Sequence, residues 1–273
     1  MERKFAKMHG LGNDFVVVDW PVGQAPPAPA QVRAWADRHT GVGFDQLLTV
    51  TTPSTKDADA DYRVFNADGG EVEQCGNGAR CIVRFIAERD GRQQVRLHSR
   101  AGLVEGALAG EEVQVNLGVP SFDPAALPFV GQEQALRYQL QIDAATVEFG
   151  AVSLGNPHIV LPVDSVEQAA VGILGPKLEA HPAFPQRTNV GFMQVVDSGR
   201  IRLRVFERGV GETRACGTGA AAAVAVARRW QQVAERVRVE LPGGLLEVDW
   251  QGGDQPLWLR GPATKVFEGI LSL

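Results

Sequence analysis

The sequence predicts an α/β protein of two similar halves, each with many strands around one buried helix. Three observations predict this: the chain repeats itself at about half its length, strand patterns dominate, and each half contains one strongly apolar helix pattern. The length of 273 residues exceeds one average domain and falls short of three. We therefore expect one domain per half.

The repeat centres on a cysteine motif. Residues 63–80 align with residues 204–221 without a gap, and nine of the eighteen positions are identical. Both segments contain Cys-Gly-x-Gly-Ala, so Cys75 and Cys216 occupy equivalent positions at an offset of 141. Shorter matches before and after these segments keep the same order along both halves. Chance similarity does not explain matches that are ordered in this way.

Strand patterns precede each motif cysteine. Tyr62–Asn66 and Ile201–Phe206 alternate apolar and polar residues, as half-buried strands do. Short β-branched runs bounded by turn residues predict further strands, at Phe15–Asp19, Gln46–Val50, Gln94–His98, Val113–Leu117, His158–Leu161, Gly191–Val196, Val237–Leu241 and Leu245–Trp250.

Helix patterns follow each motif cysteine. Asn77–Arg89 and Thr218–Trp230 are apolar over most of their circumference, which predicts buried helices. The second consists largely of alanine, so surrounding strands can approach it closely. A further short helix is expected near Val32–Arg38, after the proline-containing loop 21–30.

Composition excludes several classes of protein. Hydrophobic residues make up 44% and charged residues 22%, as in ordinary globular proteins. The formal net charge of −5 argues against a nucleic-acid partner. The longest apolar run, Ala220–Ala227, is too short to span a membrane, and no signal-peptide core follows the N-terminus. Three cysteines without CxxC pairs favour a reducing, cytoplasmic location. The five histidines show no metal-ligand spacing, so we expect no metal.

A Cys-Gly-x-Gly motif at the start of a buried helix is suited to binding a carboxylate. The first helical N–H groups have no intrahelical partner, and the helix dipole places positive charge there. Glycines let the backbone approach the ligand. The same field is expected to lower the pKa of each motif thiol. Cys81 lies in an apolar run and is expected only to pack in the core.

Two such motifs in equivalent halves predict a two-base racemase or epimerase. One cysteine, as thiolate, removes the α-proton from one face of a carbon, and the other, as thiol, protonates the opposite face. No pyridoxal-lysine context, dinucleotide fingerprint or metal cluster is evident in the sequence. The chemistry is therefore expected to need no cofactor.

The chain resembles the diaminopimelate epimerase family from end to end. The segments that carry the resemblance are Lys7–Phe15, Gly41–Leu48, Phe65–Gly69, Gln74–Cys81, Gly155–His158, Asn189–Phe192, Glu207–Gly209, Ala215–Ala220 and Gly261–Ala263. Members interconvert LL- and meso-diaminopimelate, for lysine and peptidoglycan precursor synthesis. The resemblance implies two pseudo-symmetric domains, each a β-barrel-like sheet around a central helix, over residues 1–117 with 263–273 and over residues 118–262.

Site roles follow from matching the family motifs. Cys75 and Cys216 would be the acid–base pair, with His158 and Glu207 assisting catalysis. The carboxylate would be held by the amides of Gly76, Asn77, Gly217 and Thr218, and the remaining substrate-binding positions would be Asn13, Gln46, Asn66, Asn156, Asn189, Glu207 and Arg208. The resemblance also implies a homodimer, with Phe267 at a contact position where close relatives often have tyrosine.

Other interpretations of the residues remain open at this point. Asn156, before a proline, could be a turn residue, and His158 taken alone could be structural. Another cofactor-independent racemase of the same fold, acting on proline or hydroxyproline, would not need Arg208 and the asparagines for a second charged end. A thiol–disulfide oxidoreductase lacks support from a CxxC motif. A non-catalytic amino-acid-binding protein would bind diaminopimelate without exchanging its α-proton.

Overall fold

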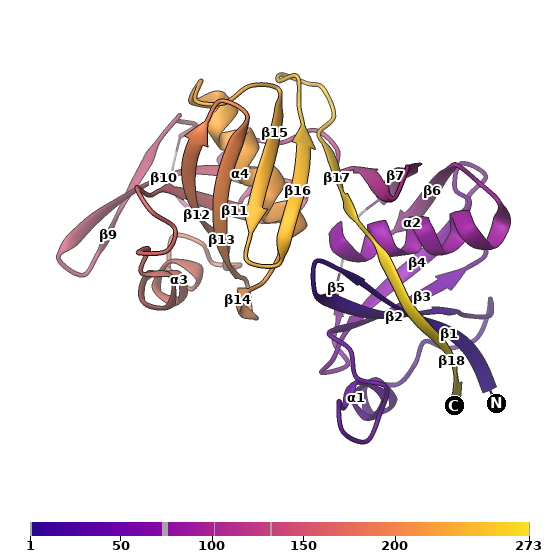
Figure 1. The fold of residues 1–273 in the computed structure, drawn as a ribbon. Coiled ribbons are helices and arrows are strands. Elements are labelled where there is room, and N and C mark those ends of the chain that lie inside the picture. The colour runs from indigo at the N-terminus through magenta and orange to yellow at the C-terminus, as the bar shows by residue number, and fades with distance from the viewer. Residues whose placement is uncertain (1, 73–75, 101, 132, 273) are drawn as a thin grey trace. The chain divides into compact units, whose positions relative to one another are not determined.

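A computed structural model describes residues 2–72, 76–100, 102–131 and 133–272 of the chain. The chain forms two compact units, Met1–Asn116 with Arg260–Leu273, and Leu117–Leu259. Each unit is a mixed sheet wrapped around one central helix, α2 in the first unit and α4 in the second (Figure 1). Within the described residues, no helix has both the length and the apolar character needed to cross a membrane.

The first unit carries the N-terminal half of the chain and its C-terminal strand. Its elements in chain order are β1 (Glu2–Gly10), β2 (Asn13–Asp19), α1 (Pro29–Ala36), β3 (Gln46–Thr51), β4 (Ala60–Asn66), β5 (Glu71–Val72), α2 (Gly76–Asp90), β6 (Gln94–Ser99), β7 (Gly102–Ala109), β8 (Glu112–Asn116) and β18 (Thr264–Ser272). Strand β17 (Trp258–Pro262) leads into this unit from the second. The closing strand β18 pairs antiparallel with β1.

The second unit follows the same order of elements. It contains a short 3-10 turn (Pro124–Ala126), β9 (Tyr138–Ile142), β10 (Ala145–Ser153), β11 (Pro157–Pro162), α3 (Val171–Glu179), β12 (Asn189–Asp197), β13 (Arg200–Glu207), β14 (Gly211–Thr213), α4 (Gly217–Arg229), β15 (Arg236–Leu241) and β16 (Gly244–Asp249).

The strand pairing confirms the internal repeat. In the first unit β2 pairs parallel with β3, β3 antiparallel with β4, and β4 both antiparallel with β5 and parallel with β6. In the second unit β11, β12, β13, β14 and β15 repeat these pairings with the same directions. A hairpin precedes each set, β1–β2 and β10–β11. Both units therefore have one topology, as the aligned sequences predicted.

Each central helix is buried because small residues let the sheet close around it. Every residue from Gly217 to Ala227 in α4 is buried. A Cβ on Gly150 of β10 would lie 2.5 Å from Val226 of that helix, and one on Gly106 of β7 would lie 2.4 Å from Val83 of α2. Glycine at these two strand positions therefore permits the close approach of strand and helix.

The second face of each sheet is covered by a short helix. Val32 and Ala36 of α1 pack on a cluster that includes Val16 and Leu47, and α3 covers an equivalent apolar cluster in the second unit. The expected helix Val32–Arg38 is in fact Pro29–Ala36. It begins earlier because proline suits the first helical turn, and it ends where the Asp37 carboxylate accepts hydrogen bonds from the backbone of residues 39 and 40.

Candidate active site

Cys216 caps the N-terminus of α4. Its Sγ accepts a hydrogen bond from the Gly219 N–H at 3.4 Å and lies 3.7 Å from Thr218 Oγ1. A Cβ on Gly219 would lie 3.2 Å from this sulfur, so glycine leaves room for the thiol at the helix start. The side chain is buried, with 5% of Cys216 exposed. The thiol is therefore held in a fixed position at the N-terminus of α4.

The pKa of Cys216 is raised well above its usual value, which corrects the expectation from the sequence. Burial is the largest cause, and the neighbouring Glu207 carboxylate adds to it through its charge and hydrogen bond. The Gly219 N–H and the Thr218 hydroxyl act in the opposite direction but are outweighed. The expected lowering considered only the helix N-terminus, whereas desolvation and a like charge disfavour a thiolate more strongly.

Glu207 lies at the end of β13, close enough to this thiol for its negative charge to raise the thiol pKa. The Thr213 hydroxyl on β14 donates to Glu207 Oε1, which fixes the carboxylate. Burial raises the pKa of Glu207, while its hydrogen bonds with Thr213 and Cys216 partly offset that effect. A buried carboxylate beside a thiol is suited to exchange a proton with it.

His158 is connected to the same helix start through two hydrogen bonds. The His158 Nε2 lies 3.0 Å from Asn156 Oδ1, and Asn156 Nδ2 donates to Thr218 Oγ1 at 3.3 Å. His158 is 2% exposed, and burial, assisted by the charge of Arg208, lowers its pKa to about 3. The imidazole is therefore neutral at physiological pH.

This neutral histidine predicts a specific loss of stability in acid. The unfolded chain binds a proton at His158 below about pH 6.5, whereas the folded chain binds it only near pH 3. Stability is therefore lost as the pH falls between these values, and lowering the pH from 7.5 to 4.5 costs on the order of 2 to 3 kcal/mol through this residue. We expect His158→Phe to show a correspondingly smaller loss in urea unfolding. Equal losses in both proteins would contradict the buried neutral state.

Arg208 lies in a tight turn that joins β13 to β14. Val210 N donates to Glu207 O at 3.1 Å, and Gly209 at the third position has a φ of +73°, which favours glycine. Asn189 at the start of β12 accepts from the Arg208 N–H at 3.0 Å and donates to Pro157 O at 2.9 Å. The structure thus joins Asn189 to Arg208, which directly follows Glu207 in the chain.

The first unit carries an equivalent polar network. Asn77 on α2 donates to Asn13 Oδ1 at 3.3 Å, and Asn13 donates to Asp45 Oδ2 at 3.0 Å. Gln46 and Asn66, directly opposite on β3 and β4, are joined by a hydrogen bond of 2.8 Å. Gly76 opens α2. The predicted catalytic residue Cys75 lies outside the described residues.

The two networks share a scaffold but differ in their ionisable groups. The Asn13–Asn77 bond of the first unit corresponds to the Asn156–Thr218 bond of the second. At the strand positions beside these bonds, the second unit has the ionisable residues His158 and Glu207, whereas the first unit has residues that do not ionise. The full set of corresponding pairs is Asn13 with Asn156, Phe15 with His158, Gln46 with Asn189, Asn66 with Glu207, and Asn77 with Thr218.

Comparison with known proteins decides the family. The sequence profile described as diaminopimelate epimerase matches residues 5–122 and 150–266. The chain belongs to the diaminopimelate epimerase family. Curated relatives of that name include one from Stutzerimonas stutzeri (strain A1501), 51% identical over 99% of both chains, and one from Nitrosomonas europaea, 50% identical over 100% of both.

Solved structures with the same fold extend beyond this family. A hydroxyproline epimerase from Agrobacterium vitis matches with a TM-score of 0.73 and 16% identity, covering 100% of this chain and 93% of that one. A PhzF-family phenazine biosynthesis protein from Bacillus anthracis matches with a TM-score of 0.70 and 16% identity, covering 100% of both chains. At these identities the likeness concerns the fold alone.

Several residues of this epimerase-family site were missed by the sequence analysis. Asp45 and Thr213 hold predicted site side chains, although neither was among the predicted site residues. Arg80, fully buried on α2, donates to Asn77 Oδ1 at 3.0 Å and to Pro262 O at 3.2 Å. Its position directly after Cys-Gly-x-Gly-Ala could have indicated that Arg80 belongs to the site. A buried arginine needs hydrogen-bond acceptors such as these two.

The raised thiol pKa predicts slow alkylation of Cys216. At pH 8 we expect iodoacetamide to label it at least ~10-fold more slowly than free cysteine, because the thiolate is the nucleophile. The rate should still be rising above pH 9. Peptide mass spectrometry resolves this residue from the other cysteines, and Glu207→Gln should label faster because the neighbouring charge is gone. Rapid labelling with a plateau below pH 8 would contradict the assignment.

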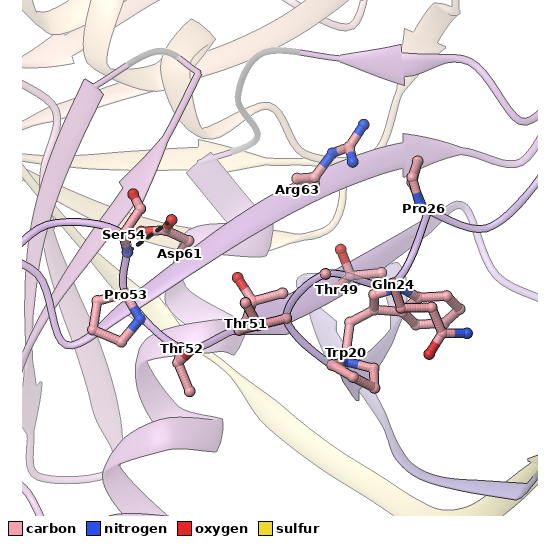
Figure 2. Close-up of a pocket in the computed structure, with 13 residues that line it drawn as sticks. Trp20, Gln24, Pro26, Thr49, Thr51, Thr52, Pro53, Ser54, Asp61 and Arg63 are labelled. Carbon is pink, nitrogen blue, oxygen red and sulfur yellow. Dashed lines mark hydrogen bonds between the residues drawn. The ribbon is translucent and has the colours of Figure 1, made fainter.

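A cavity in the first unit lies apart from the predicted site residues that the structure describes. It has a volume of about 290 Å³ and is lined by Trp20, Thr49, Thr51, Asp61 and Arg63 among others, with the Ser54 N–H donating to Asp61 (Figure 2). No predicted substrate-binding side chain lines it. The cavity lies toward the C-terminal end of β3, whereas Gln46 begins that strand.

Phe267 lies on β18 and is 47% exposed. Its ring meets Phe5 edge-on, with centroids 6.0 Å apart. Val266 and Ile270 on the same strand are also exposed, at 56% and 60%. The predicted contact residue thus lies on a strand that carries three exposed apolar side chains.

Proposed function

We propose that this protein interconverts LL- and meso-2,6-diaminopimelate by cofactor-independent, two-base epimerisation. One observation carries the proposal: the buried Cys216 thiol caps a buried helix and lies beside the Glu207 carboxylate, whose charge raises the thiol pKa. The internal repeat gives Cys75 the equivalent sequence position. The family membership and the names of relatives about half identical to this chain support diaminopimelate as the substrate.

The proposed reaction transfers one proton at each face of the α-carbon. A cysteine thiolate takes the α-proton as the C–H electron pair moves toward the carboxylate, forming an enolate-like species. The opposite thiol then gives its proton to the other face of that carbon and becomes a thiolate. One S–H bond forms and one breaks, so the enzyme ends with the two protonation states exchanged.

Stabilising the enolate-like transition state is the main task of the site. If the acidities of the α-carbon and a thiol differ by about ten pKa units, the difference corresponds to roughly 14 kcal/mol. Helical N–H groups at Gly217 and Thr218, with those at Gly76 and Asn77, would hold the reacting carboxylate where negative charge accumulates. The raised pKa of Cys216 also makes its thiolate a stronger base once it forms.

Glu207 and His158 are proposed to assist the Cys216 half of the reaction. Glu207 would accept the thiol proton and return it, since the carboxylate lies near enough to the thiol to act on its pKa. His158, kept neutral by burial, would orient Asn156 and through it Thr218. A neutral imidazole adds no positive charge that would trap the thiolate.

The distal end of the substrate is proposed to bind the amide side chains and Arg208. A guanidinium is suited to bind a carboxylate through two parallel hydrogen bonds. The side-chain amides can both donate and accept, so they can bind an amino group and a carboxylate in one arrangement. These positions are Asn13, Gln46, Asn66, Asn156, Asn189 and Arg208, with Glu207 reaching the substrate amino group.

We further propose a cytoplasmic homodimer with Phe267 at a contact between subunits. The exposed apolar residues on β18 support such a contact, because burial of apolar surface stabilises association. Sedimentation of the wild type and of Phe267→Glu tests it. If the wild type is a dimer and Phe267→Glu is an equally stable dimer, Phe267 does not lie at the contact between subunits.

Direct conversion tests the proposed reaction. Purified protein with reductant and EDTA, and without added pyridoxal phosphate, is incubated with LL-diaminopimelate, and chiral chromatography follows the meso isomer. We expect the two isomers to reach equilibrium from either side, while L-proline and hydroxyproline stay unchanged. Conversion of proline but not of diaminopimelate would support the racemase alternative. Binding of diaminopimelate without conversion would support a non-catalytic protein.

A further inference from the structure

A buried carboxylate on α3 contacts the turn that carries Arg208. Glu179, the last residue of α3, is 4% exposed, and its Oε1 accepts a hydrogen bond from the Gly209 N–H at 2.9 Å. The same oxygen lies 3.3 Å from Arg187 NH1. The Glu179 carbonyl also accepts from Thr188 N at 3.2 Å. One residue thus links the end of α3, the segment before β12 and the turn after β13.

Two side chains hold successive N–H groups of this turn. Asn189 Oδ1 accepts from Arg208 N at 3.0 Å, and Glu179 accepts from the next N–H. Within the turn a backbone hydrogen bond joins Val210 N to Glu207 O, and the strand pairing of β13 with β14 begins at Glu207 and Gly211. This four-residue turn contains Gly209 and is followed directly by Gly211, so it has little intrinsic rigidity. Its conformation therefore depends on these two acceptors.

The first unit has a corresponding link of opposite polarity. There Arg33 on α1 donates to Asp68 O at 3.0 Å, within the turn closed by Gly69 N and Asn66 O. Both units therefore connect the short helix to the turn after the fourth strand of the repeat. In the second unit the helix residue is a carboxylate, Glu179, that accepts a hydrogen bond from the turn, and this turn contains Arg208. The turn at residues 66–69 of the first unit contains no arginine.

We propose that Glu179 is a positioning residue that fixes the Glu207–Val210 turn and thereby aims Arg208 at the distal carboxylate of the substrate. The inference rests on the proposed function, since it concerns how that site selects diaminopimelate. Glu179 does not touch the reacting atoms. It acts through the Gly209 N–H, and its ion pair with the half-exposed Arg187 contributes little.

Kinetics of three Glu179 variants test the proposal. Glu179→Gln keeps an oxygen acceptor and should stay within about 3-fold of the wild-type kcat/KM for diaminopimelate, whereas Glu179→Ala should lose about 10- to 100-fold. Glu179→Leu fills the space without an acceptor and should lose as much, which separates the hydrogen bond from a cavity. Lys177→Ala, an exposed change on the same helix, is the matched control.

A double-mutant cycle with Arg208 distinguishes positioning from a general structural role. In an Arg208→Ala background, Glu179→Leu should change kcat/KM by less than about 2-fold, because the residue it positions is already gone. If the loss of kcat/KM in the double variant equals the product of the losses in the two single variants, the proposal is overturned. A Glu179→Leu variant that keeps wild-type kcat/KM would also overturn it.

Amide hydrogen exchange tests the turn without any turnover. In the free protein the Gly209 amide should exchange at least ~10-fold faster in Glu179→Leu than in the wild type or Glu179→Gln. Unchanged exchange would overturn the positioning role even if the enzyme is active. If instead the wild type fails to convert diaminopimelate while Gly209 responds as expected, the proposed function fails and the turn link stands.

Discussion

Replacing either Cys75 or Cys216 by alanine is expected to lower turnover of diaminopimelate by at least ~10³-fold, the scale for loss of a positioned acid–base group. Each thiol serves one face of the α-carbon, so neither can substitute for the other. The measurement is the initial rate of meso formation from LL-diaminopimelate, with folding of each variant checked by circular dichroism.

Cys81→Ala provides the matched control for both variants. Cys81 is fully buried on α2, within the apolar core of the first unit. Its replacement costs stability but should leave the turnover of the folded fraction unchanged. Near-normal turnover by the Cys75 or the Cys216 variant would exclude the two-thiol mechanism.

Lysine and DD-diaminopimelate are expected to be very poor substrates, with kcat/KM values about 10⁴-fold lower than those of the LL and meso isomers. Lysine lacks the distal carboxylate and would leave the Arg208 guanidinium without its proposed charged partner, at ~1–3 kcal/mol or more for a buried polar group. The DD isomer carries every group, but its distal centre has the wrong configuration. Distal contacts should also support turnover itself, because remote binding energy contributes to the transition state.

Rates of α-proton exchange into D2O measure this specificity for each compound. Arg208→Ala should lower kcat/KM for diaminopimelate while leaving the slow exchange from lysine nearly unchanged, so the ratio between the two falls. Comparable exchange from lysine and diaminopimelate in the wild type would show that Arg208 and the amides do not bind the distal group.

The central helices and the repeat were predictable because their signals are local. A circumference made largely of alanine predicts burial of α4, and the paired Cys-Gly-x-Gly motifs align the halves. Strand β1 was missed because Lys7 and His9 interrupt its apolar pattern. Lys7 is nonetheless 8% exposed, since its ammonium group is paired with Asp14 and bonds the carbonyl of residue 43. Such compensation depends on residues that are distant in sequence.

The remaining errors also concern tertiary context. Helix α3 was missed, and it contains Pro176, which normally argues against a helix interior. The direction of the Cys216 pKa was wrong because the helix N-terminus is readable from sequence, whereas burial and the approach of Glu207 are not. Glu179 and Thr213 lie in no recognised motif, and only the folded chain brings them to Gly209 and Glu207.

The origin of the new α-hydrogen in the first turnover tests the two-base account most directly. LL-diaminopimelate is incubated with the enzyme in D2O, and the first few per cent of reaction are quenched and examined by mass spectrometry. Because the donating thiol has exchanged with solvent, the account predicts that nearly every meso molecule carries deuterium at the inverted carbon while the remaining LL substrate carries almost none. Meso product that retains the substrate's own hydrogen would indicate one base serving both faces and would contradict the account.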